Sequence, residues 1–146
     1  MRAVTASRRA LLLAAGLAVA PPAAAQIRFE DVAGRAGVGH VVRNSETAER
    51  YQIEPMIAGV ALFDYDNDGR LDIFFCNGAT IPGLEKSDGS FSNRLYRNGP
   101  GLVFEDVTAR AGVAGAGYSM GATASDFDDD GWADLYVTGV DRNILY

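Results

Sequence analysis

The sequence predicts an all-β fold, a partial β-propeller of about two four-stranded blades, on the basis of three observations. Short β-branched and aromatic runs alternate with Gly, Asn, Asp and Pro, which is the pattern of strands and turns rather than helices. A ten-residue phrase and an acidic nine-residue segment each occur twice. Four short strands in a period of roughly 60 residues are typical of a propeller.

The two repeated units set the spacing of the predicted blades. Residues 29–38 recur at 104–113 with eight of ten positions identical, and the acidic segment 64–72 recurs at 126–134. The first unit returns after 75 residues and the second after 62, so the first copy contains 13 extra residues. We place this insertion in the polar stretch 39–54 and predict a loop there.

Each predicted strand is an apolar run bounded by turn residues. One strand leads into the first acidic segment, a second leaves it, and a third meets a fourth across the turn at 98–101. The same order restarts after the second copy of the phrase, and residues 27–32 are expected to be the last strand of a preceding blade. The other predicted strands lie at residues 57–63, 71–76, 94–97, 103–107, 119–125, 135–138 and 144–146.

The first 25 residues have the features of an export signal. Three arginines among the first nine residues precede the apolar run 10–20, and small residues at 23–25 offer a cleavage site. The apolar run is too short for a membrane span, so no stable membrane insertion is expected after cleavage. We predict a signal peptide at 1–25, a repeat domain at 26–146, and a periplasmic or extracellular location. The sequence leaves open whether export is of the general or twin-arginine type.

The net charge of the chain and its single cysteine argue against a nucleic-acid partner and against an intrachain disulfide. All 19 acidic residues lie beyond residue 25, whereas three of the 13 basic residues precede it, so the mature chain carries a net charge of −9. This charge and the lack of a Lys/Arg cluster argue against a nucleic-acid partner. Cys76 is the only cysteine, so no intrachain disulfide braces the chain, and we expect it to be a small buried apolar residue. Bound metal is the expected substitute.

The acidic segments predict about two Ca²⁺ sites. In each, acids stand at positions 1, 3, 5 and 9 with Gly at 6, which places carboxylates around a tight turn. Calcium accepts six to eight hard oxygen ligands, magnesium demands a stricter octahedron, and the lack of thiol or imidazole disfavours zinc. The predicted ligands are Asp64, Asp66, Asp68, the Arg70 carbonyl and Asp72 in the first loop, and Asp126, Asp128, Asp130, the Trp132 carbonyl and Asp134 in the second.

Two other kinds of loop share features of these acidic segments. An EF-hand requires Glu at position 12 and flanking helices, but position 12 is Phe75 in one copy and Val137 in the other. An acidic hairpin turn without metal is the simpler alternative, because Asp, Asn and Gly are common turn residues. Two copies of the same spaced quartet favour calcium over that alternative.

The sequence resembles a known family at these loops. Residues 59–63 and 121–125, each with the loop that follows, resemble FG-GAP (VCBS-type) repeats of integrin-alpha-like β-propellers. Residues 93–98 and the phrase at 104–113 are similar to the ASPIC/UnbV and cartilage acidic protein branch. The resemblance implies calcium bound within each blade and a complete propeller of about seven blades. This chain would then be a fragment of a larger propeller.

The function that follows is a binding or adhesion scaffold for an unknown protein or carbohydrate ligand, not an enzyme. The alternative is a non-catalytic scaffold part of a larger secreted polysaccharide-active enzyme. Every close acid pair belongs to a metal loop, which leaves none for glycoside hydrolysis. We expect His40 to be a solvated loop residue, and Tyr118 and Trp132 to serve packing.

Overall fold

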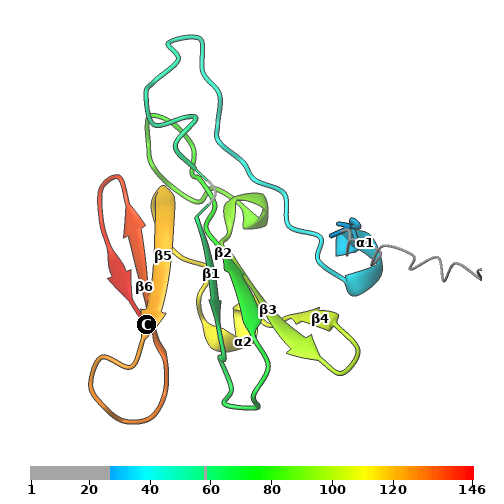
Figure 1. The fold of residues 1–146 in the computed structure, drawn as a ribbon. Helices are drawn as coiled ribbons and strands as arrows, with labels where there is room; N and C mark the ends of the chain where they lie inside the picture. Colours follow the sequence, from blue (N-terminus) through cyan, green and yellow to red (C-terminus); the bar gives the residue numbers. More distant parts are fainter. Residues whose placement is uncertain (1–26, 58) are drawn as a thin grey trace, which may run out of the picture. The chain divides into compact units, whose positions relative to one another are not determined.

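The computed structural model describes residues 27–57 and 59–146, so the predicted signal peptide lies outside the described residues. The chain divides into two units, Met1–Glu30 and Asp31–Tyr146. The second unit contains two antiparallel sheets, one of four strands and one of three (Figure 1). The predicted all-β fold is therefore confirmed. No helix in the described part of the chain is long and apolar enough to cross a membrane.

Both sheets follow chain order, as hairpins do. In the first sheet, Phe63 pairs with Asp72 across the first acidic loop. In the second, Ser125 pairs with Asp134 across the second acidic loop. The described residues form seven strands, each of which overlaps a predicted strand: β1 (Val60–Phe63), β2 (Asp72–Phe75), β3 (Arg94–Gly99), β4 (Val103–Asp106), β5 (Ser119–Ser125), β6 (Asp134–Gly139) and β7 (Ile144–Leu145).

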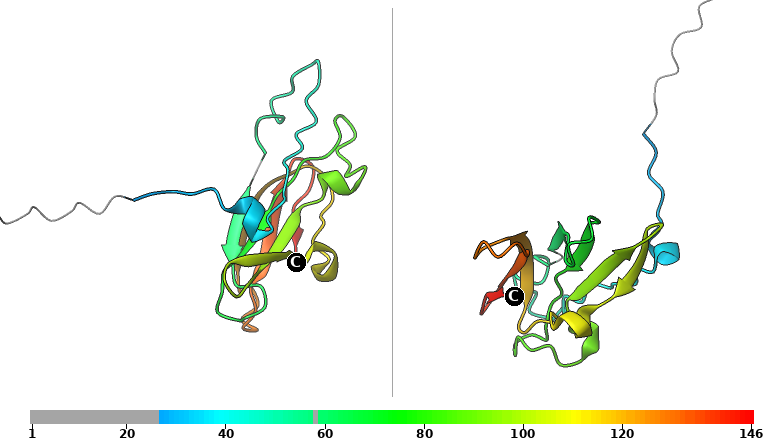
Figure 2. Two further views of the ribbon diagram at one scale, coloured as in Figure 1. Left: turned by 90° about the vertical axis from the view of Figure 1, so that its right-hand side faces the viewer. Right: turned by 90° about the horizontal axis from the view of Figure 1, so that it is seen from below.

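One apolar core joins the two sheets. It contains Phe74 and Leu95 from the first sheet and Leu135 and Val137 from the second, all at most 3% exposed. The sheets lie side by side along β1 and β5 (Figure 2). Their shared core shows that each sheet buries a face that it could not bury alone.

The repeated phrase forms two short helices that the sequence did not predict, α1 (Ala33–Ala36) and α2 (Thr108–Ala111). Each ends at a glycine in the left-handed region, Gly37 at φ 84° and Gly112 at φ 70°, which explains why glycine occupies both positions. A third short helix, the 3-10 turn η1, covers Gly89–Phe91.

The strand predicted at 27–32 is wrong, because these residues form no strand. A strand needs a neighbour to pair its N–H and C=O groups, and no described strand pairs with this segment. Instead the Asp31 carboxylate accepts a hydrogen bond from the N–H of Ala33 at 3.0 Å. The Asp106 carboxylate bonds the N–H of Thr108 in the same way at 3.0 Å, so the repeated phrase has a repeated conformation.

The insertion at 39–54 contains turns but no helix or strand, as predicted for a loop. It is nevertheless fastened to the sheets. The Asn77 side chain, 1% exposed, accepts from the N–H of Arg43 at 2.7 Å. The Tyr118 hydroxyl donates to the carbonyl of Asn44 at 3.2 Å. Buried polar anchors therefore fix the path of a loop that has no regular structure.

Candidate metal centre

The two acidic loops connect β1 to β2 and β5 to β6, and lie at the same end of the two sheets (Figure 1). Their tips are in contact, because the side-chain amide of Asn67 donates to the carbonyl of Gly131 at 3.0 Å. The sheet packing thus brings together two segments that are 62 residues apart in the chain.

Backbone N–H groups hold the carboxylates of the first loop. Asp64 accepts from the N–H of Asp68 at 3.0 Å and of Gly69 at 2.7 Å. Asp72, which is fully buried, accepts from the N–H of Tyr65 at 2.7 Å. These bonds fold the loop around its own acidic side chains.

The second loop repeats this pattern at equivalent positions. Asp126 accepts from the N–H of Asp130 at 3.1 Å and of Gly131 at 2.9 Å. Asp134 accepts from the N–H of Phe127 at 2.7 Å. Two segments with different side chains at several positions therefore share one loop conformation.

Left-handed backbone positions make this conformation possible. In the first loop Asn67 has φ 56° and Gly69 has φ 83°, and in the second Asp129 has φ 61° and Gly131 has φ 88°. Asn, Asp and Gly are the residues that adopt this region most readily. The spacing of acids and glycine in the sequence thus corresponds to a defined turn.

Three of the four predicted aspartates in each loop converge. Carboxylate oxygens of Asp64, Asp66 and Asp72 all lie within 4.8 Å of one another, and so do those of a second group, made of Asp126, Asp128 and Asp130. Asp68 and Asp134 lie outside these groups, and their role as ligands stays a prediction. The carbonyls of Arg70 and Trp132 also remain predicted ligands.

Arginine side chains occupy part of the first loop, which the sequence did not predict. Arg97 of β3 forms ion pairs with Asp66 and with Asp68, the latter at 3.0 Å. Arg70 also pairs with Asp68. In the second loop Trp132 stands at the position equivalent to Arg70. The two loops share a backbone but differ in their charge.

These contacts shift the pKa values of the first loop. Desolvation disfavours the charged form of Asp66, but the hydrogen bond and charge of Arg97 outweigh it, so the Asp66 pKa lies below its usual range. Burial raises the pKa of Asp72, and the charges of Asp66 and Asp68 add to that rise, while hydrogen bonds from the Asn98 and Tyr65 N–H groups oppose it. A cation beside Asp72 would relieve both the burial and the crowding.

The first loop has a further property that suits a cation. The Oδ1 atom of Asp66 is buried and has no hydrogen-bond partner. Arg97 contacts the other oxygen of this carboxylate, Oδ2, so Oδ1 stays unsatisfied, which is costly unless a second donor or a cation reaches it. Hard carboxylate oxygens within 4.8 Å of one another are the donor set that calcium prefers. The residues present therefore fit Ca²⁺.

Four side chains outside the predicted ligand set also have roles predicted from the sequence. Cys76 is fully buried, as predicted, and burial raises the pKa of its thiol to about 11. Tyr118 is fully buried, which confirms its packing role, whereas Trp132 is 54% exposed and does not pack into the core. The expectation of a solvated His40 is wrong, because the residue is partly buried, its Nε2 is closed off from solvent, and its ring stacks on Phe75 with centroids 4.8 Å apart.

Comparison with protein families agrees with the geometry of the two loops. An FG-GAP-like repeat model matches residues 64–137, which is half of the chain. Searches of curated proteins and of solved structures returned no match. Because the family match starts at the first residue of the first acidic loop and continues through the second, this chain belongs to the FG-GAP-like repeat family.

Proposed function

We propose that this chain is a calcium-binding segment of a β-propeller that acts outside the cytoplasm as a binding or interaction module. The observation that carries the proposal is the duplicated loop, in which three carboxylates approach one another within 4.8 Å. The unpartnered Oδ1 of Asp66 supports it, because a bound cation would supply the missing partner.

In this proposal the metal is structural. The predicted ligands in each loop would hold one Ca²⁺, about two in total, and the ion would offset the repulsion among the carboxylates. Binding only to the folded loop links calcium concentration to the free energy of unfolding. Extracellular calcium modules commonly have dissociation constants of roughly 10⁻⁴ to 10⁻³ M, which suits an exported protein.

The propeller architecture, the finer family branch and the export route are parts of the same proposal. Two antiparallel sheets that share one core are compatible with successive blades. The recurring phrase at 29–38 and 104–113 supports the ASPIC/UnbV and cartilage acidic protein branch. The basic and apolar character of residues 1–25 supports cleavage of a signal peptide.

We further propose that the module is not catalytic and that its partner is a protein or a carbohydrate. The acids that an enzyme could use are engaged in the hydrogen bonds of the loops, as Asp64 and Asp126 are. The net charge of −6 for the full sequence argues against a nucleic-acid partner.

Thermal unfolding in millimolar calcium and in excess chelator, followed by circular dichroism, tests the calcium proposal. Calcium at ten times its dissociation constant stabilises the folded state by about 1.4 kcal/mol per site, so the midpoint should rise by several degrees. An Asp66→Asn, Asp128→Asn double variant should lose most of this rise. The exposed Glu49→Gln variant removes one charge elsewhere and should keep it. A cooperative melt that calcium does not move would refute the metal assignment.

A further inference from the structure

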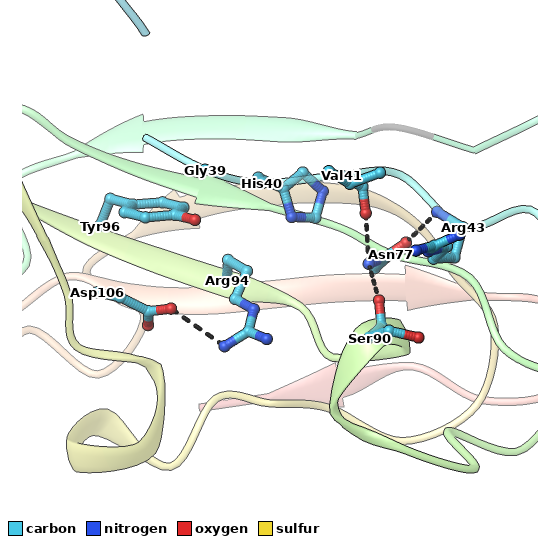
Figure 3. Close-up of a pocket in the computed structure, with 9 residues that line it drawn as sticks. All are labelled: Gly39, His40, Val41, Arg43, Asn77, Ser90, Arg94, Tyr96 and Asp106. Carbon is cyan, nitrogen blue, oxygen red and sulfur yellow. Dashed lines mark hydrogen bonds and ion pairs between the residues drawn. The ribbon is translucent and has the colours of Figure 1, made fainter. Parts of the chain in front are cut away.

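A polar pocket of about 340 Å³ lies between the inserted loop and the first sheet (Figure 3). Its wall includes His40 and Arg43 from the loop, Arg94 and Tyr96 from β3, and Asp106 from β4. None of its lining residues belongs to the acidic loops. Neither the proposed calcium sites nor the family match assigns it a role.

The floor of the pocket is rigidly built. Asn77, 1% exposed, donates to the carbonyls of Val41 at 3.2 Å and Ser90 at 3.0 Å, and accepts from the N–H of Arg43 at 2.7 Å. A Cβ at Gly78 would collide with the Arg43 carbonyl oxygen, so the loop passes directly against the segment that follows β2. The backbone of the loop beside the pocket is therefore fixed before any ligand arrives, and this lowers the entropic cost of binding even though side chains of the wall must still move.

His40 contributes a hydrogen-bond acceptor. Its ring stacks on Phe75 at an interplanar angle of 17°, and burial lowers its pKa, although a hydrogen bond to the Cys76 backbone opposes this shift. The imidazole is thus neutral at pH 7, and Nε2 has no partner. Because a neutral imidazole has one donor and one acceptor nitrogen, and Cys76 takes the donor at Nδ1, Nε2 is the acceptor.

Arginines supply the complementary donors. The guanidinium of Arg94 is fixed by Asp106 at 3.0 Å and by the carbonyl of Gly89 at 2.8 Å. Arg43 has an exposed side chain, and its loop contact to Asn77 comes from its backbone N–H. Among the charged residues that line the pocket, two arginines stand against one aspartate, so the lining carries one net positive charge in a chain whose net charge is −6. Planar guanidinium groups match the two oxygens of a carboxylate.

We propose that this pocket binds a small monocarboxylate that also carries a hydroxyl, of the kind found in a uronic acid. Arg43 and Arg94 would hold the carboxylate, and Nε2 of His40 would accept the hydroxyl hydrogen. Nε2 is closed off from water, so the hydroxyl reaches it by a shift of the pocket wall. Satisfying a buried unpaired acceptor favours that shift.

Isothermal titration of the full chain with four probes tests this assignment. Glucuronate carries both groups, glucose lacks the carboxylate, acetate lacks the hydroxyl, and lactate has both without the sugar ring. We expect glucuronate to bind at least tenfold more tightly than glucose or acetate. An oligouronide that binds more tightly than glucuronate would identify an acidic polysaccharide as the source of the ligand. Equal affinity for lactate and glucuronate would identify a free hydroxy acid, rather than a sugar acid, as the ligand of the pocket.

Three variants locate the binding on the pocket. Arg43→Gln should weaken glucuronate binding at least tenfold, since it spares the backbone bond to Asn77. His40→Phe keeps an aromatic ring on Phe75 but lacks the acceptor, and should weaken glucuronate and spare acetate. Arg110→Gln removes an exposed arginine that pairs with Glu105 outside the pocket, and should bind like the wild type. Equal binding of glucuronate and glucose, or equal losses in the Arg43 and Arg110 variants, would overturn the proposal.

Discussion

Arg97 distinguishes two loops that share the same backbone. Its guanidinium contacts Asp66 and Asp68, while its side chain remains 31% exposed. A cation that binds the first loop must share these carboxylates with a positive charge that is already there. At the scale of single residues, the first loop is therefore expected to bind calcium more weakly than its aspartates alone would.

Replacing Arg97 with leucine should raise the calcium affinity of the first loop. A partly exposed ion pair contributes up to about 1 kcal/mol, so the expected gain is roughly two- to fivefold. Calorimetric titration on an Asp128→Asn background, which silences the second loop, would measure it. The Arg110→Leu variant controls for the loss of a surface charge. Unchanged affinity in the Arg97 variant would show that this arginine does not compete with the metal.

Lys86, the only lysine in the sequence, titrates in an unusual range. Its ammonium group donates to the carbonyls of Asn77 at 3.0 Å and Phe91 at 2.8 Å, and burial lowers its pKa to about 8. Its ordinary pKa of 10.5 applies to the unfolded chain, which therefore binds more protons than the folded chain between pH 8 and 10.5. Stability should consequently rise with pH across this window.

Urea unfolding at pH 7.5 and at pH 9 tests this expectation. The wild type should be more stable at pH 9, and Lys86→Met should lose that difference. Above pH 9 the Cys76 thiol lowers stability as the pH rises. Its pKa is about 11 in the folded chain but 9.0 in the unfolded chain, so the unfolded chain loses this proton first. A Cys76→Ala variant removes that effect and serves as the control. The same pH dependence in wild type and Lys86→Met would exclude this lysine as its source.

The strands could be predicted because glycine, proline and acidic turn residues bound each apolar run. The helices α1 and α2 could not, because four residues are too short to show a 3.6-residue period. Residues 27–32 have a strand-like composition but no partner strand, and composition cannot reveal a missing neighbour.

The candidate metal site was predictable for a related reason. Its aspartates lie within nine residues of one another, so local spacing is enough to identify them. The contact between Arg97 and Asp66 joins positions 31 residues apart and depends on the pairing of β2 with β3. The family-like segment 93–98 contains Arg97, but its sequence does not indicate that Arg97 pairs with Asp66. His40 was missed because its burial results from the path of an irregular loop.

The junction between β1 and β5 depends on two glycines. A Cβ at Gly59 would lie 2.5 Å from the Cα of Gly121, a distance that real Cβ atoms do not adopt. Gly59→Ala should therefore lower the free energy of unfolding by about 1–3 kcal/mol, as overpacking does. Gly34→Ala is the matched control, because its new methyl group would meet no atom of another segment within 4 Å. Chemical unfolding that gives equal stability for the two variants would show that the sheets can separate at this junction without cost.

For the molecule as a whole, the second sheet leaves apolar side chains uncovered. Tyr136 and Leu145 are cross-strand partners and are 39% and 52% exposed. In a propeller the next blade would cover such side chains, so we expect this chain to self-associate as its concentration rises. Light scattering after size exclusion should show this association, and a Leu145→Lys variant should reduce it. Ala48→Lys adds the same charge at an exposed position of the loop at 39–54, away from the second sheet, and serves as the comparison. Monomeric behaviour of the wild type at high concentration would contradict the expectation.

If each loop binds calcium as proposed, the hydrogen bond from Asn67 to Gly131 would couple the two binding events. An ion that orders the first loop would also fix Asn67, which holds the backbone of the second loop at Gly131. The second ion would then bind to a loop that has already lost part of its conformational freedom. Thermodynamic linkage requires that each ion change the binding free energy of the other by the same amount. A run of such repeats would then respond to calcium over a narrower concentration range than independent loops, with a Hill coefficient above one.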